Sequence, residues 1–362
     1  MPRKSDDLKD RLACYRQNED YEVSVVRMLF SCDLPLLELA FVLLAVVICP
    51  LAAQISPSTG RSNRVTLTYM GTAAWEISDG NTVILVDPYL SRILVPPHGA
   101  GSAATGRVPG DTRPEHRWNE VVSPDTASID AHIGRADFVL VTHTHVDHVM
   151  DVPHIALKTH ATVIGTESTQ NVMRAYSVPE DQLITVRGGE DYEFGKFSLK
   201  VIPSIHSALD HKHYFSSATF PAGMKAPLTL EQMNIEGGTL AYLIRFDGHQ
   251  ILAFGGMNYI EREIEGLTPD VVLVGASGSR HEIYDYTGRL MRDLHFPALV
   301  LPTHWDNFVA PYDASQQPAV DALQSFEQEV KAASPKTKVI VPKYFEPIPL
   351  EAAGGSLTSS SD

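Results

Sequence analysis

The sequence predicts an α/β protein with a four-layer αββα sandwich, in which two β-sheets pack face to face and helices cover both outer faces. Three observations lead to this prediction. Strand-like segments come in two blocks, and helical patterns follow each block. Side chains able to do chemistry come directly after several of the short apolar strands. The length of 362 residues, 44% of them hydrophobic, is enough for one large domain or two smaller ones with a real core.

The first block of strands opens the folded body near Val65. Its segments alternate between apolar and polar residues or form short apolar runs, and they lie at 65–69, 75–78, 82–86, 136–141 and 162–165. The turn signal Asp79-Gly80-Asn81 predicts a hairpin between the second and third of these segments. A helix is predicted at 169–176 and ends before Pro179, because proline cannot continue a helix.

The second block of strands has the same kinds of pattern. Its segments lie at 183–186, 197–203, 238–246, 250–254, 271–274 and 298–302. A turn centred on Gly248 predicts a hairpin between the third and fourth of them. Apolar residues then recur at helical spacing from Val320 to Val330, which predicts a late helix.

The rest of the chain divides by composition. We predict a polar N-terminal extension (1–33), a signal peptide or membrane anchor (34–54), a linker (55–63), the folded body (64–347) and a flexible tail (348–362). The stretch from Leu39 to Ala53 carries no charge; it is short for a membrane span and typical of a signal-peptide core. It predicts a protein that is exported, to the periplasm or the medium, or anchored to a membrane.

Residues 96–128 are rich in proline, glycine and serine and have little periodicity. A stretch of this length is usually a functional loop or a disordered insertion. Because the motif described below follows at once, a lid or substrate-channel loop is one interpretation, and a disordered insertion is the other.

Charge and cysteine usage exclude some classes of function. The net charge is -15 and the pI is about 5.4, which argues against a nucleic-acid partner because phosphate binding needs a basic field. All three cysteines lie in the first fifty residues, so the folded body uses neither disulfides nor thiolate ligands. These observations favour a small-molecule substrate, and they leave open whether the chain forms a homodimer.

One motif organises the body, the segment THTHVDHVMD from Thr142 to Asp151. It leaves the end of a predicted strand in a tight turn, and its chemistry-bearing side chains are His143, His145, Asp147 and His148. Imidazole nitrogens and carboxylates are the ligands that Zn²⁺ takes in proteins. The alternative is a cluster of surface histidines, but further matches downstream argue against it.

Two more histidines follow predicted strands, His206 and His304. A lone histidine after a strand is more often structural, but two in addition to the motif favour metal ligation or direct catalysis. Histidines with weaker context are interpreted as surface or lid residues: His211, His213, His249 and His281.

This pattern, an HxHxDH motif followed by histidines at strand ends, resembles the metallo-β-lactamase-fold hydrolases over about residues 64–345. The resemblance implies two metal sites bridged by an aspartate. One site would use His143, His145 and His206, and the other would use Asp147, His148 and His304. It also implies that Asp87, at the end of a strand of the same sheet, supports the metal loop from behind.

The sequence departs from the family at the bridging aspartate. That residue is expected after the strand 251–254, but the turn Gly255–Asn258 carries no carboxylate. Without it, two neighbouring cations lack the anion that offsets their repulsion. We therefore expect one zinc per chain, with two as the alternative. Asn258 is expected either to complete the site with Asp147, His148 and His304 or to shape the turn.

The Gly-Gly-Met-Asn turn and the segment Pro302–Phe308 resemble the branch that contains chlorothalonil hydrolytic dehalogenase. This resemblance implies a zinc-dependent hydrolase in which metal-bound hydroxide displaces chloride from an electron-poor aromatic ring. In a one-metal site, His145 would accept the proton from the water, with Asp147 as the second catalytic residue. Trp305 would stack on an aromatic substrate or pack as a core residue.

Other functions remain as alternative hypotheses. Lactone or ester hydrolysis and phosphodiester hydrolysis occur on the same fold, although the acidity and the missing aspartate count against a nuclease. An iron-dependent oxidoreductase would need the full two-metal set. An exported metal-binding protein without activity is the last alternative, and metal analysis together with chloride release would distinguish these classes.

Overall fold

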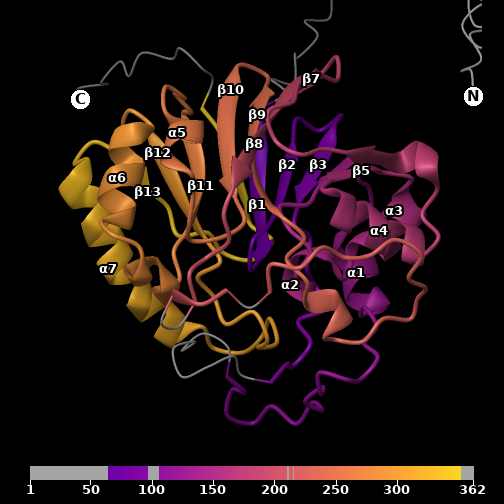
Figure 1. Ribbon diagram of the computed structural model, residues 1–362. Coiled ribbons are helices and arrows are strands. Elements are labelled where there is room, and N and C mark those ends of the chain that lie inside the picture. The colour runs from indigo at the N-terminus through magenta and orange to yellow at the C-terminus, as the bar shows by residue number, and fades with distance from the viewer. Residues whose placement is uncertain (1–63, 97–105, 210–211, 215, 352–362) are drawn as a thin grey trace, which may run out of the picture. The chain divides into compact units, whose positions relative to one another are not determined.

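The computed structural model describes residues 64–96, 106–209, 212–214 and 216–351. Within this part of the chain, two seven-stranded mixed sheets form the centre and helices lie on either side of them (Figure 1). The predicted αββα sandwich is therefore confirmed. The predicted extension, signal peptide or anchor, and linker lie outside the described residues. Among the described helices, none has the length and apolar character needed to span a membrane.

The first sheet contains strands from the N-terminal half and one strand from the C-terminus. Its order is β14-β1-β2-β3-β4-β5-β6, and the run from β3 to β6 is parallel. The strands are β1 (Thr66–Gly71), β2 (Ala74–Ser78), β3 (Val83–Val86), β4 (Phe138–Leu140), β5 (Thr162–Gly165), β6 (Leu183–Thr185) and β14 (Pro347–Pro349).

The strands of the second sheet come later in the chain. Their order in the sheet is β13-β12-β11-β10-β9-β8-β7. Strands β10 to β13 are parallel, and β8 runs in the same direction as β10 because both are antiparallel to β9. The strands are β7 (Asp191–Glu193), β8 (Phe197–Ser204), β9 (Thr239–Phe246), β10 (His249–Phe254), β11 (Val271–Gly275), β12 (Leu299–Thr303) and β13 (Lys338–Val339).

Helices from each half of the body cover the sheets (Figure 1). Those beside the first sheet are α1 (Thr126–His132), α2 (Val146–Val149), α3 (Val152–Thr159) and α4 (Glu167–Ala175). Those beside the second are α5 (Glu261–Ile264), α6 (Tyr286–Asp293) and α7 (Gln317–Ala333). Short 3₁₀ turns are η1 (Glu180–Gln182), η3 (Gln232–Asn234) and η4 (Gly278–Glu282).

The central strands β4 and β5 of the first sheet pack on both faces, which is why their sequences are short apolar runs. In β4, Val139 belongs to the core under the helices, whereas Leu140 belongs to the core that also contains β8 to β12. In β5, Val163 and Ile164 divide in the same way. Successive side chains of a strand point to opposite faces, so a buried central strand needs apolar residues at every position.

The sequence analysis missed several short elements, among them α1, α6, β7, β13 and β14. Helix α1 has seven residues, and Ile129 is its only buried one, so it has no stripe to recognise. It lies partly inside the stretch 96–128 that was expected to be a loop or a disordered insertion. The described part of that stretch is fastened to the body, since the Arg113 guanidinium donates to Arg92 O at 2.8 Å and His116 N donates to Leu94 O at 2.9 Å.

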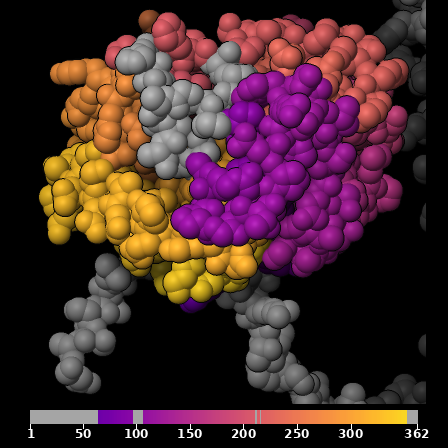
Figure 2. Space-filling view, turned by 90° about the horizontal axis from the view of Figure 1, so that it is seen from below, coloured from indigo at the N-terminus to yellow at the C-terminus, as the bar shows by residue number. Residues whose placement is uncertain are grey.

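The arrangement of strands brings distant segments to one edge. Parallel strands end at the same side of a sheet, so the segments after β3, β4 and β5 meet there, as do those after β8, β10, β11 and β12. Figure 2 shows the molecule from below; the purple segment that follows Gly106 lies there beside orange and yellow segments from the C-terminal half. The candidate site is at this edge.

Candidate metal centre

Two groups of three potential ligands lie side by side at the strand ends. The first consists of His143, His145 and His206, and the second consists of Asp147, His148 and His304. Within each group, one ligand atom from every residue lies within 4.8 Å of the others. The ring centroids of His143 and His148 are 3.8 Å apart, so the two groups adjoin. The structure therefore brings together all six residues that the motif and the downstream histidines predicted.

The local fold of the motif is set by Asp87, which follows β3. Its Oδ1 accepts a hydrogen bond from Thr142 N at 2.7 Å, and its Oδ2 accepts one from Thr142 Oγ1 at 2.6 Å. This contact fixes the start of the turn after β4. Helix α2 then begins directly after His145, so that Asp147 and His148 lie in a single helical turn.

The same carboxylate orients His148. The Nδ1 atom of His148 lies 2.8 Å from Asp87 Oδ2, and both side chains are fully buried. This hydrogen bond holds the proton on Nδ1 and leaves Nε2, which lies 3.5 Å from Asp147 Oδ2, free to face a cation. Burial alone would lower the pKa of His148, but the charges of Asp147 and Asp87 raise it above its usual value.

Asp147 is the carboxylate of the second group. Its Oδ2 lies 3.2 Å from His304 Nε2. Burial favours a raised pKa for Asp147, but the charge on His148 and the contact with His304 more than offset it and hold the pKa well below the usual range. The group is therefore ionised near neutral pH, as a metal ligand must be.

Two histidines of the first group, His143 and His206, are held neutral. Burial, with a smaller contribution from neighbouring histidine charge, lowers the pKa of His143 well below its usual value and that of His206 to about 4. His143 Nε2 is buried and has no hydrogen-bond partner among the described residues. Neutral imidazoles and an ionised carboxylate form a donor set that suits a divalent cation such as zinc. The residues present therefore fit the metal that the fold implies.

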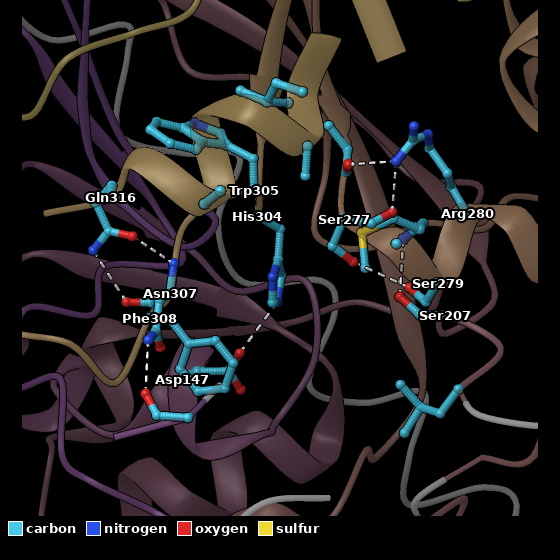
Figure 3. Close-up of a pocket in the computed structure, with 18 of the residues that line it drawn as sticks. Asp147, Ser207, Ser277, Ser279, Arg280, His304, Trp305, Asn307, Phe308 and Gln316 are labelled. Carbon is cyan, nitrogen blue, oxygen red and sulfur yellow. Dashed lines mark hydrogen bonds and ion pairs between the residues drawn. The ribbon is translucent and has the colours of Figure 1, made fainter. Parts of the chain in front are cut away.

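The two groups open into a cavity of about 640 Å³. Figure 3 shows His304, Trp305 and Phe308 on one side of it and Ser207, Ser277 and Ser279 on the other. Apolar side chains cover much of the wall: Val95, Val108, Pro109, Leu209, Met257, Trp305, Phe308, Pro318, Ala319, Ala322 and Leu323. Residues 106–109 line the cavity as well, which agrees with the interpretation of this stretch as part of a substrate channel.

The arginines of the cavity wall are already engaged. The guanidinium of Arg280 lies 2.9 Å from Glu329 Oε1 and also donates to Ser325 Oγ and to Ala276 O. Arg107 donates to two backbone carbonyls. Among the described lining residues, the cationic side chains are thus spent on protein partners, and the wall is suited to an uncharged ligand.

Trp305 lies where a stacking residue was expected, on the cavity wall next to His304 (Figure 3). Its ring also stacks on Tyr69, with centroids 6.0 Å apart and planes inclined by 22°, and the residue is 7% exposed. It therefore belongs to the core as well as to the cavity wall.

Asn258 forms hydrogen bonds with protein groups beside the cluster. Asn258 is not among the residues that line the cavity. Its Oδ1 accepts from Tyr259 N at 3.0 Å, and its Nδ2 donates to the backbone oxygen of His206 at 3.2 Å. Asn258 thus fastens the segment that carries His206 to the turn after β10, and its direct coordination of a metal stays a prediction.

A pair of substitutions distinguishes the two roles of Asn258. We expect Asn258→Ala to retain tightly bound zinc and to lower the free energy of unfolding by about 1–3 kcal/mol, because His206 O loses its buried donor. Asn258→Asp should destabilise the protein as well, since it places a carboxylate oxygen against that carbonyl. Zinc affinity and denaturant unfolding measure both effects. A higher zinc affinity in Asn258→Asp would show that residue 258 is a ligand.

The remaining histidines differ in their exposure and position. His213 is exposed, and His249 is buried at the start of β10 with its Nδ1 2.6 Å from Asp270 Oδ2. His281 is exposed, lies 3.4 Å from Glu329 and lines the cavity, which fits its interpretation as a surface or lid residue. The same interpretation was wrong for His249, because that residue is buried. His211 lies outside the described residues.

Sequence reasoning missed two residues that shape the site. Thr142 connects the motif to Asp87, and Ser207 accepts a hydrogen bond from Met257 N at 2.9 Å on the cavity wall. Both are direct neighbours of predicted ligands, and a small hydroxyl residue beside a ligand at a strand end was the available signal. That signal is weak, because such residues are common in turns.

The αββα layers and a histidine–aspartate cluster at the strand ends define a protein of the metallo-β-lactamase class. Residues 66–304 match the family model for the beta-lactamase superfamily domain, and the chain belongs to this family. The match covers strands β1 to β12 and every residue of the two ligand groups.

Curated relatives and a solved structure resemble this chain. The chain is 24% identical over 300 residues to a UPF0173 metal-dependent hydrolase of Myxococcus xanthus, covering 81% of this chain and 86% of that protein. A protein of the same description from Archaeoglobus fulgidus is 23% identical over 286 residues, or 77% and 96%. Igni18, a metallo hydrolase of Ignicoccus hospitalis, is similar in structure with a TM-score of 0.49 and 18% identity, over 79% of this chain and 98% of that one.

Proposed function

We propose that the protein is a zinc-dependent hydrolase that acts on a small, uncharged and largely apolar substrate. The observation that carries this proposal is the buried pair of ligand groups opening into an apolar cavity. The family and the donor set support metal-dependent hydrolysis in general. The shape and chemistry of the cavity wall support the substrate class.

The residues divide the work as follows. Asp147, His148 and His304 would hold the cation, with Asp87 fixing the ring of His148. A bound zinc ion lowers the pKa of a water ligand to near 7 and so supplies a nucleophile at neutral pH. His145, buried beside the second ligand group, accepts the proton. The apolar wall of the cavity excludes bulk water from the substrate.

We favour one tightly held zinc per chain over two. The first ligand group could hold a second cation, but the turn after β10 offers no bridging carboxylate. A side chain at Gly255 would place its Cβ 1.9 Å from Thr142 Oγ1, and one at Gly256 would place it 2.8 Å from Ser207 Oγ. Neighbouring groups occupy the space in which a side chain at either glycine would lie. The turn therefore packs closely against the segments that carry Thr142 and Ser207.

Hydrolytic dehalogenation of a chlorinated aromatic is our first candidate reaction. The apolar wall with Trp305 and Phe308 accommodates a flat ring, and the Gly-Gly-Met-Asn turn resembles the dehalogenase branch. Lactone or ester cleavage is the second candidate, because it needs the same nucleophile. A phosphodiester is disfavoured, since the guanidinium of Arg280 on the described wall is paired with Glu329 and that of Arg107 donates to backbone carbonyls.

A substrate panel tests the proposal. Purified full-length protein with bound zinc should be incubated with electron-poor chlorinated aromatics, aryl esters, lactones and a phosphodiester. We expect chloride release from the aromatics and little turnover of the phosphodiester. His304→Ala serves as the control for contaminating activity. Fast phosphodiester cleavage would contradict the proposed substrate class, and turnover of esters alone would replace the first candidate by the second.

A further inference from the structure

The backbone of His304 adopts a conformation that is unfavourable for most residues other than glycine. Its φ is 51°, in the left-handed region, and it follows the last residue of β12 directly. Two residues that contact this segment have the same conformation, Thr72 with φ 56° and Arg92 with φ 44°. Such residues persist only where the surrounding structure determines them, and they cluster at functional sites.

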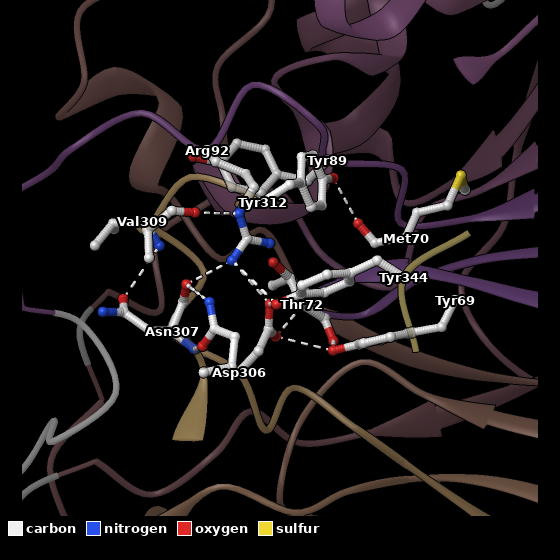
Figure 4. A network of polar contacts seen from close by, with 12 residues as sticks. Tyr69, Met70, Thr72, Tyr89, Arg92, Asp306, Asn307, Val309, Tyr312 and Tyr344 are labelled. Carbon is white, nitrogen blue, oxygen red and sulfur yellow. Dashed lines mark hydrogen bonds and ion pairs between the residues drawn. The ribbon is translucent and has the colours of Figure 1, made fainter. Parts of the chain in front are cut away.

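A buried carboxylate two residues after His304 joins these segments (Figure 4). Asp306 Oδ1 accepts from Tyr69 Oη and from Thr72 N, both at 2.8 Å. Its Oδ2 lies 2.9 Å from Arg92 Nη2 and accepts from Tyr344 Oη at 2.7 Å. Each carboxylate oxygen of Asp306 therefore has two donor partners. The side chains of Asp306 and Arg92 are 0% and 2% exposed.

Further hydrogen bonds fasten the segment on both sides of Asp306. Before it, His304 N donates to Thr72 O, as does Thr303 Oγ1. After it, the guanidinium of Arg92 donates to the backbone oxygens of Asn307 and Ala310. The segment that follows β12 in the second sheet is thus held by the turn between β1 and β2 and by the loop after β3, both from the first sheet.

We propose that the Arg92–Asp306 pair is a positioning device for the metal centre, which holds His304 in its left-handed conformation so that Nε2 faces Asp147. A buried ion pair adds little stability over apolar packing of the same volume, but it fixes geometry. Here the pair fixes His304, a residue that would not readily adopt this backbone conformation by itself. The inference rests on the proposed role of His304 as a metal ligand.

Asp306→Asn tests the proposal in the full-length chain. The amide keeps the size of the carboxylate but cannot accept from four donors. We expect the zinc affinity of the folded protein, measured by competition with a chelator well below the unfolding temperature, to fall by about 10- to 100-fold, as for other residues that orient a ligand. His304→Ala sets the scale for complete loss of that ligand.

The matched control is Glu329→Gln, which breaks another arginine–carboxylate pair, Arg280–Glu329, in which Arg280 is buried and Glu329 is half-buried. It should lower the unfolding temperature and leave zinc affinity unchanged. Tyr344→Phe removes one of the four donors and should weaken zinc binding in the same direction but less; it decides the matter if Asp306→Asn does not fold.

Two results would overturn the proposal, and they differ. Unchanged zinc affinity in folded Asp306→Asn or, where that variant does not fold, in Tyr344→Phe, together with a clear loss in His304→Ala, would show that the pair contributes to stability alone. Unchanged zinc affinity in His304→Ala would instead remove His304 from the metal centre and the proposed function would lose its ligand set.

Discussion

Removal of zinc by a chelator is expected to abolish hydrolysis by the full-length protein, and added zinc is expected to restore it. The cation is worth several kcal/mol to such a reaction, which corresponds to a loss of about 10³-fold or more. In the proposed scheme the cation activates the attacking water and His145 is the base, so the reaction depends on the metal. Turnover before and after chelation, with metal content determined on the same samples, measures the effect.

Substitution of a ligand should reproduce the effect of chelation. Asp147→Asn keeps the shape of the side chain but removes the charge that the pair of histidines stabilises. It should lose zinc and activity together while the protein remains folded. Full activity of metal-free wild type would end the proposal of metal-dependent hydrolysis.

The second large effect is expected from His145→Ala. If His145 accepts the proton, its removal should lower kcat by about 10²- to 10⁴-fold while zinc stays bound. Its ring lies 4.6 Å from that of His206 and 4.8 Å from that of His143, in the group that lacks a carboxylate. The kcat and the zinc content of the purified variant are the two measurements.

The same variant tests the number of metals. Loss of one of two zinc ions from His145→Ala would place His143, His145 and His206 in a second metal site. His213→Ala is the control, because His213 is exposed and does not line the cavity. It should retain both zinc and turnover, so a fall in kcat in this control as well would point to a general effect of removing histidines.

Much of the ligand set could be read from local sequence. Each of His143, His206 and His304 follows a short apolar strand, and the αββα arrangement brings the ends of parallel strands to one edge. The local sequence pattern and the αββα architecture were therefore enough to predict that these six residues lie together. The role of Asp87 was implied by resemblance, and the hydrogen bonds to Thr142 and His148 supply its geometry.

Asn258 shows what local sequence leaves open. The amide has an oxygen able to bind a metal and follows a strand beside the site, so the sequence favoured coordination. In the folded chain the amide nitrogen lies 3.2 Å from the backbone oxygen of His206 and donates to it, and the amide oxygen accepts from Tyr259 N at 3.0 Å. Which partners a polar side chain finds depends on distances that only the folded chain has.

By itself, then, the sequence determined the class of fold, the edge at which the chemistry lies and the types of ligand, because these depend on periodicity and on the order of strands. Only the tertiary structure decided how the ligands are held. Asp306 and Tyr69 are 237 residues apart and meet across the two sheets. No local pattern marks such a contact, since burial of an ion pair and the backbone conformation of His304 are properties of packing between distant segments.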